Sequence, residues 1–275
     1  MSHPDRAVAR DQVGSPNRGW LLVAVAGAGV GLLGGMIGLG GAEFRLPLLI
    51  GVFAFVALQA VIVNKALSLL VVATAIPARL LAVPLEELAP HWTIVVNLLA
   101  GSLFGAYLGA TWATRMATRT LYRVLSVLLV LIAVALVTTH LGQVQPAHLN
   151  GPAQAVAGVV AGGAIGVVAA LMGVAGGELL IPTIVLLYGV DIKIAGSLSL
   201  MVSLPTMLVA FARYSRDKSF GVLVENKTFV LAMAAGSVIG TVAGGALLGV
   251  VPSALLVPLL SLLLLVSARK VWQHG

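Results

Sequence analysis

Ten apolar stretches, most of them close to the length that spans a lipid bilayer, determine what this chain can fold into. A transmembrane helix needs about 20 apolar residues to cross roughly 30 Å of hydrocarbon. Charged residues form 9% of the 275-residue chain and hydrophobic residues 60%, whereas a globular domain carries about 25% charged residues. We therefore predict an all-α polytopic membrane protein. The stretches are 20–37, 44–63, 66–83, 92–113, 121–138, 153–172, 179–190, 194–212, 229–250 and 254–268.

The positions of lysine and arginine predict the orientation, because cytoplasmic loops retain basic residues. If all ten stretches cross, thirteen of the 16 basic residues share one side: three in the first 18 residues, Lys65, three at 115–123, four at 213–227, and two at 269–270. Both termini are then cytoplasmic, and the loop with Glu86 and Glu87 faces outward. The alternative is eight crossings, with the second and seventh stretches re-entrant. The seventh, 179–190, is too short to cross alone and is predicted to be a half-helix.

The chain resembles itself at a spacing of 135 residues. GLGGAEFRLPLL at 38–49 aligns with GVAGGELLIPTI at 173–184, so that Gly41, Glu43 and Pro47 align with Gly176, Glu178 and Pro182. The predicted division is a cytoplasmic tail at 1–19, a first transmembrane repeat at 20–140, a linker at 141–152 and a second repeat at 153–270. Five crossings per repeat is an odd number, so the second repeat enters the membrane from the opposite side. Such an inverted-topology repeat is typical of secondary transporters.

These paired motifs, together with the Gly-Ser-Leu-Ser run at 196–199, resemble the TauE/SafE family of sulfite exporter-like permeases over about residues 20–272. The resemblance implies a secondary carrier of small anions, mostly sulfur-containing ones such as sulfite, thiosulfate and organosulfonates. It also implies a prokaryotic cytoplasmic membrane as the location.

The glycine-rich motifs predict broken helices, because glycine lets the backbone leave helical geometry beside a wet cavity. A helix that restarts there presents free N–H groups and the positive end of its dipole to an anion. Serines on the following helices add hydroxyl donors, unless each bonds its own helix backbone. The predicted substrate-binding residues are Gly38, Gly40, Gly41, Glu43, Arg45, Pro47, Ser68, Gly173, Gly176, Gly177, Glu178, Pro182, Ser197 and Ser199.

Glu43 and Glu178 are candidates for proton coupling, because a carboxyl group inside a membrane segment is costly and by default functional. The alternative is that each caps the N–H groups of its own helix. Arg45 either binds substrate oxygens or extends to the interface. For Asn64, Lys65 and Arg79 we expect a topological or interfacial role. Three glycine series with four-residue spacing predict close helix packing: 101, 105 and 109; 158, 162 and 166; 236, 240 and 244.

No motif predicts an enzyme. The chain has no cysteine, P-loop, HExxH helix or GxSxG elbow, so we predict no catalytic residues, no cofactor and no metal site. The predicted function is a secondary permease for a small anion, proton-coupled through the glutamates, that works by alternating access of the two repeats. A metal-cation carrier and a passive anion channel are the alternatives. The expected partners are the anionic substrate and the lipid bilayer, without nucleic acid, and a homo-oligomer is an open alternative to a monomer.

Overall fold

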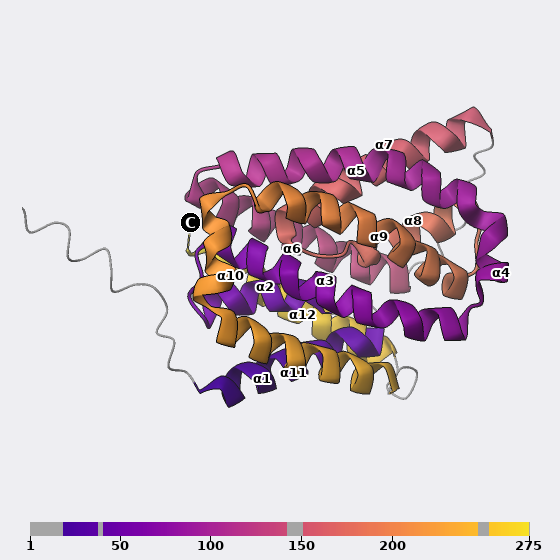
Figure 1. Cartoon of the computed structure of the whole chain (residues 1–275). Helices are drawn as coiled ribbons and strands as arrows, with labels where there is room; N and C mark the ends of the chain where they lie inside the picture. Colours follow the sequence, from indigo (N-terminus) through magenta and orange to yellow (C-terminus); the bar gives the residue numbers. More distant parts are fainter. Residues whose placement is uncertain (1–18, 38–40, 142–150, 247–252, 275) are drawn as a thin grey trace, which may run out of the picture.

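The computed structural model of the chain describes residues 19–37, 41–141, 151–246 and 253–274 (Figure 1). All regular structure in these ranges is helical, as predicted. The first half contains α1 (Trp20–Ile37), α2 (Ala42–Gly51), α3 (Ala57–Ala82), α4 (Leu85–Leu88), η1 (Ala89–His91), α5 (Trp92–Arg115) and α6 (Thr118–Leu141). The second contains α7 (Pro152–Met172), α8 (Gly177–Tyr188), α9 (Ile192–Tyr214), η2 (Lys218–Gly221), α10 (Val222–Glu225), α11 (Lys227–Ala246) and α12 (Ser253–Trp272).

Helix lengths follow the same order in both halves: long, short, long, a brief connecting turn, then two long helices. Within the described residues, six segments are long and apolar enough to cross a membrane: Ala57–Pro77, Leu85–Arg115, Thr118–Ala135, Pro152–Met172, Ile192–Tyr214 and Lys227–Ala246. Helices α1 and α8 are apolar but shorter. The chain is thus a multi-pass α-helical membrane protein. Ten crossings and the inverted relation of the halves stay predictions.

Helices α2 and α8 are the short helices that follow the glycine motifs. The half-helix predicted in the second repeat is confirmed, because α8 has 12 residues. The first repeat differs from its prediction. Helix α2 ends at Gly51 and α3 begins at Ala57, so the predicted stretches 44–63 and 66–83 are wrong. Lys65 lies inside α3 rather than in a loop, because its charge is satisfied within the protein, as described below.

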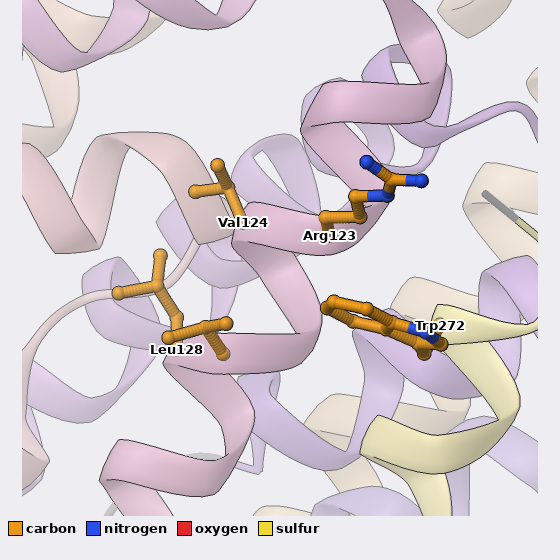
Figure 2. A pocket seen from close by; sticks show the side chains of 5 residues that line it. Arg123, Val124, Leu128 and Trp272 are labelled. Carbon is orange, nitrogen blue, oxygen red and sulfur yellow. The ribbon is translucent and has the colours of Figure 1, made fainter.

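The longest helix contacts join the two halves of the chain. Helix α1 packs along α11, and α5 packs along α7. Glycines line both seams, as predicted from their spacing: a Cβ at Gly240 would collide with the carbonyl oxygen of Ala28, and one at Gly162 with that of Leu98. The last helices of the halves, α6 and α12, also contact each other, and Figure 2 shows Arg123 of α6 beside Trp272 of α12.

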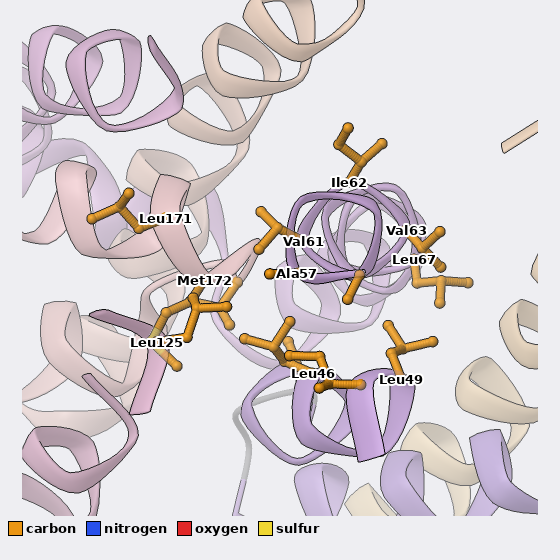
Figure 3. Close-up of a cluster of buried hydrophobic side chains, with 14 of the residues drawn as sticks. Leu46, Leu49, Ala57, Val61, Ile62, Val63, Leu67, Leu125, Leu171 and Met172 are labelled. Carbon is orange, nitrogen blue, oxygen red and sulfur yellow. The ribbon is translucent and has the colours of Figure 1, made fainter. Parts of the chain in front are cut away.

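The main apolar core holds the short helix α2 in place. Figure 3 shows Leu46 and Leu49 of α2 facing α3, with Leu125 of α6 and Met172 of α7 on the other side of the cluster. All four side chains are buried. This packing fixes α2 and the end of α7 against α3, and it thereby positions the residues around both helix breaks.

The ends of the molecule separate the connections into two groups. Figure 1 shows the start of α1, the turn at α10 and the C-terminus at one end, and α4 at the other. The basic cluster at 213–227 therefore lies at the end that carries both described termini, and the acidic Glu86 and Glu87 lie at the opposite end. This arrangement agrees with the side that the ten-crossing prediction gives to each of these segments.

Candidate functional site

A left-handed glycine begins each short helix. Gly41 precedes α2 with φ 72°, and Gly176 precedes α8 with φ 85°; L-residues with a side chain rarely adopt this conformation. Gly173, which ends α7, also has φ 70°. The predicted helix breaks are therefore present at both motifs. Gly38 and Gly40 lie outside the described residues.

The two breaks form the same first turn. The carbonyl oxygen of Gly41 accepts hydrogen bonds from the amides of Phe44 and Arg45, both at 3.2 Å. The carbonyl oxygen of Gly176 accepts from Leu179 and Leu180, at 3.1 and 2.9 Å. These acceptors lie 135 residues apart, so the sequence repeat corresponds to a repeated backbone geometry. In both helices the amides of the first two residues precede the first helical bonds and point along the positive end of the dipole.

Space is open beside the start of α8. A Cβ built on Gly177 would have no atom within 4 Å, although Gly177 itself is half-buried. Neither packing nor backbone conformation therefore requires glycine at this position. The absence of a side chain leaves the first amides of α8 accessible to a small group.

Asn64 on α3 connects the two breaks. Its Nδ2 atom donates to the carbonyl oxygen of Ala42 at 3.0 Å, in the first turn of α2, and to that of Met172 at 3.1 Å, the last residue of α7. Its Oδ1 atom lies 3.5 Å from Nη1 of Arg45. One fully buried amide thus joins the start of one broken helix to the end of the other.

Lys65 and Ser68 continue this contact along α3. The Nζ atom of Lys65 donates to the carbonyl oxygens of Ala169, at 2.9 Å, and Val174, at 2.6 Å. Ser68 donates to the carbonyl oxygen of Gly173 at 3.2 Å. The interfacial role predicted for Asn64 and Lys65 is wrong, because both side chains are 0% exposed. For Arg79, no side-chain position is described.

Arg45 does not extend to the membrane interface. Its side chain is 0% exposed, and it is among the largest fully buried side chains of the described residues. The snorkelling alternative is therefore wrong. The guanidinium lies beside Asn64 and interacts electrostatically with Glu43, two residues earlier on α2.

The two glutamates share an environment poor in hydrogen-bond donors. Both carboxyl oxygens of Glu43 and of Glu178 are buried and have no hydrogen-bond partner among the described residues. Neither short helix has a side-chain cap bond, so the capping alternative has no support in the geometry. Proline adds to the effect: Pro47 and Pro182 lack amide protons, so the backbone carbonyls of Glu43 and Glu178, four residues earlier, lose their helical donors.

The serines of α9 bond their own helix. Ser197 donates to the carbonyl oxygen of Lys193 at 3.4 Å and Ser199 to that of Gly196 at 2.8 Å. A polar contact that the sequence did not predict lies further along α9, where Thr206 and Ser102 of α5 are 2.8 Å apart through their hydroxyl oxygens. Only the spacing of hydroxyl residues on two helices pointed to it.

The predicted site residues thus form one connected group and one separate group. The connected group comprises Gly41, Glu43, Arg45, Asn64, Lys65, Ser68 and Gly173. No hydrogen bond of the described residues joins the side chain of Glu178 to it. In the same ranges, no three His, Asp or Glu side chains gather closely enough to hold a metal ion.

A comparison with protein families decides the class. The family model described as Sulfite exporter TauE/SafE matches residues 22–271, which is nearly the whole chain. The protein belongs to the TauE/SafE family. It is accordingly a membrane transporter, as the repeat and the broken helices predicted. No curated protein and no solved structure matches the chain.

Proposed function

We propose that this TauE/SafE protein is a secondary carrier for a small sulfur-containing anion such as sulfite, thiosulfate or an organosulfonate. It would operate in a prokaryotic cytoplasmic membrane with both termini in the cytoplasm. The observation that carries the proposal is the double hydrogen bond of Asn64, which brings the start of α2 and the end of α7 to one point inside the bundle. Transporters built from repeats bind substrates where broken helices meet.

The charges around this point suit an oxyanion. Arg45 and Lys65 are both buried, and a guanidinium binds the oxygens of a planar or pyramidal anion through two parallel N–H groups. In the second repeat, Leu180 and Gly196 take the aligned positions, so the first repeat supplies both cations. The open amides at Gly177 offer a further anion contact of the kind found at helix N-termini.

The glutamates supply the proton in this proposal. A buried ionised carboxylate without hydrogen-bond donors has a large desolvation cost, and binding a proton removes that cost. Protonation of Glu43 or Glu178 would also remove its repulsion of an anion at the same helix start. Anion binding and proton binding therefore favour each other, which is the basis of coupled transport.

Thermal unfolding of the purified protein in detergent tests the substrate class. A ligand that binds the folded state at 100 times its Kd adds about 2.7 kcal/mol to stability. We expect a rise in Tm with sulfite, thiosulfate or a short sulfonate, and a smaller rise in Arg45→Leu, which copies the second repeat. A rise with divalent cations and with no anion would establish the metal-carrier alternative.

Proteoliposome flux distinguishes the carrier from a channel and tests coupling. Carrier flux saturates with anion concentration. We expect Glu178→Gln and Glu43→Gln to lose the pH dependence of flux while retaining protein level, because Gln cannot exchange a proton. Glu225→Gln, on the exposed turn α10, is the matched control. Unaltered pH dependence in both glutamine variants would refute proton coupling.

A further inference from the structure

A shallow apolar groove lies between α6 and α12, at the end of the molecule that carries the C-terminus. Arg123, Val124, Val127, Leu128 and Trp272 line it. The guanidinium carbon of Arg123 lies 5.8 Å from the centre of the Trp272 ring, within the range of a cation–π contact. Figure 2 shows Arg123 and Trp272 together on one side, with Val124 and Leu128 further along the groove.

The groove combines one charged end with an apolar length. Arg123 is exposed and lies in the second turn of α6, and Val127 and Leu128 follow about one turn further from that end. Val127 and Trp272 are about half exposed, so no other part of the described chain covers them. An amphiphile with an anionic head and an apolar tail fits this order.

The surrounding charge is uniformly positive in sequence. Segment 115–123 contains three arginines, and segment 269–270 contains Arg269 and Lys270. Neither 115–141 nor 253–275 contains an acidic residue. A second copy of the chain, paired on this face by two-fold symmetry, would bring these like charges together, whereas an anionic headgroup neutralises them.

We propose that this groove binds an anionic phospholipid, with its phosphate on Arg123 and one acyl chain along Val124, Val127 and Leu128. Trp272 holds the guanidinium in place and covers the glycerol region, as tryptophans do at membrane interfaces. The site is separate from the residues around Asn64. Its test therefore does not depend on the proposed transport function.

Native mass spectrometry of the full-length protein tests this site with phosphatidylglycerol, with phosphatidylcholine of the same acyl chains, and with glycerol 3-phosphate, which lacks acyl chains. We expect tight binding of phosphatidylglycerol only. Arg123→Gln should weaken it about fivefold, the effect of one basic residue near an anionic surface. Val127→Trp should weaken it by filling the groove from an exposed position, without a change in the core.

Arg216→Gln is the matched control, because Arg216 is an exposed arginine at the same end of the molecule and outside the groove. An equal loss of lipid in Arg216→Gln would show general charge attraction and overturn the site. So would unchanged lipid binding in Val127→Trp. A shift from dimer to monomer in Val127→Trp, without loss of lipid, would assign the groove to a second copy of the chain.

Discussion

Lys65 places an ammonium group at the carbonyl end of helix α7. It bonds the carbonyl oxygens of Ala169 and Val174, which lie on either side of the break and have no helical donors of their own at this end. The negative end of the helix dipole favours a cation here. Lys65 therefore stabilises the break in the second repeat from a helix in the first repeat.

Removing this ammonium group should destabilise the fold. In Lys65→Met the side-chain length is retained but both carbonyls lose a buried donor, and each unsatisfied polar group costs about 1–3 kcal/mol. We expect Lys65→Met to unfold at a lower temperature in detergent and Lys65→Arg to retain more of the stability. Lys193→Met, at an exposed position near the start of α9, should have no effect. Equal Tm values for Lys65→Met and wild type would refute this role.

The residues of the site were predictable to different degrees. Gly41 and Gly176 were identified because the repeat aligned them, and a repeated glycine has few explanations other than a required backbone conformation. The burial of Arg45 and Lys65 was not predictable, because their partners lie 19 to 109 residues away in sequence. A linear pattern places a charge in a loop when it cannot show the carbonyls that satisfy it.

At the scale of elements, the second break depends on two glycines with different roles. Gly173 has a positive φ, and a Cβ there would collide with the carbonyl oxygen of Val61 on α3. Gly177 is helical and faces open space. The first glycine permits the close contact between the break and α3. The second leaves room beside the first amides of α8.

Alanine at these two positions should separate folding from binding. Gly173→Ala meets both strain and a backbone clash, and the left-handed conformation alone costs about 1–2 kcal/mol, so we expect a large fall in Tm. Gly177→Ala should keep or raise Tm, because alanine favours a helix over glycine by about 1 kcal/mol. It should nevertheless reduce the stabilisation by sulfur oxyanions. Full anion response in Gly177→Ala would exclude an anion at the start of α8.

The two short helices show why the sequence predicted one half-helix and not the other. The apolar run of α8 ends at Gly189 and Asp191, which are residues that favour turns. The connection after α2, residues 52–56, reads Val-Phe-Ala-Phe-Val and contains no such signal. It is held by packing instead: the ring centroids of Phe53 and Phe55 lie 4.8 and 5.1 Å from that of Phe229. Tertiary contact therefore ends α2 where local sequence would continue it.

At the scale of the whole molecule, the structural units do not coincide with the halves of the sequence. Helices α1, α2 and α3 pack with α11, and the corresponding α7, α8 and α9 pack with α5. Each unit therefore takes one helix from the other repeat. The units meet where α3 contacts α9 and the end of α7, and Asn64, Lys65 and Ser68 lie in that contact. We infer that alternating access moves these mixed units, and that the α3 side chains release or re-form their bonds as it does.

The glycine seams that hold each mixed unit together can be tested with neighbouring residues. A Cβ at Gly162 would collide with the carbonyl oxygen of Leu98 on α5, whereas one at Gly163 would first meet an atom at 3.7 Å, an ordinary contact. Gly162→Ala should lower stability by about 1–3 kcal/mol, the usual cost of overpacking. Gly163→Ala should be neutral or stabilising. Similar unfolding temperatures for the two variants would show that α5 and α7 can separate without cost.

The absence of cysteine from the chain makes the orientation of the whole molecule measurable with single introduced cysteines. If ten stretches cross, Ala117 and Ser215 face the cytoplasm and Glu87 faces outward. A membrane-impermeant thiol reagent applied to intact cells should then label Glu87→Cys and spare Ala117→Cys and Ser215→Cys, all three positions being exposed. In the eight-crossing alternative the acidic loop turns inward and the connection around residue 117 turns outward, so labelling of Ala117→Cys with protection of Glu87→Cys would establish that topology. Because Glu87 and Ala117 lie at the two ends of α5 and its preceding turn, the result also fixes the direction of the helix that packs against the second repeat.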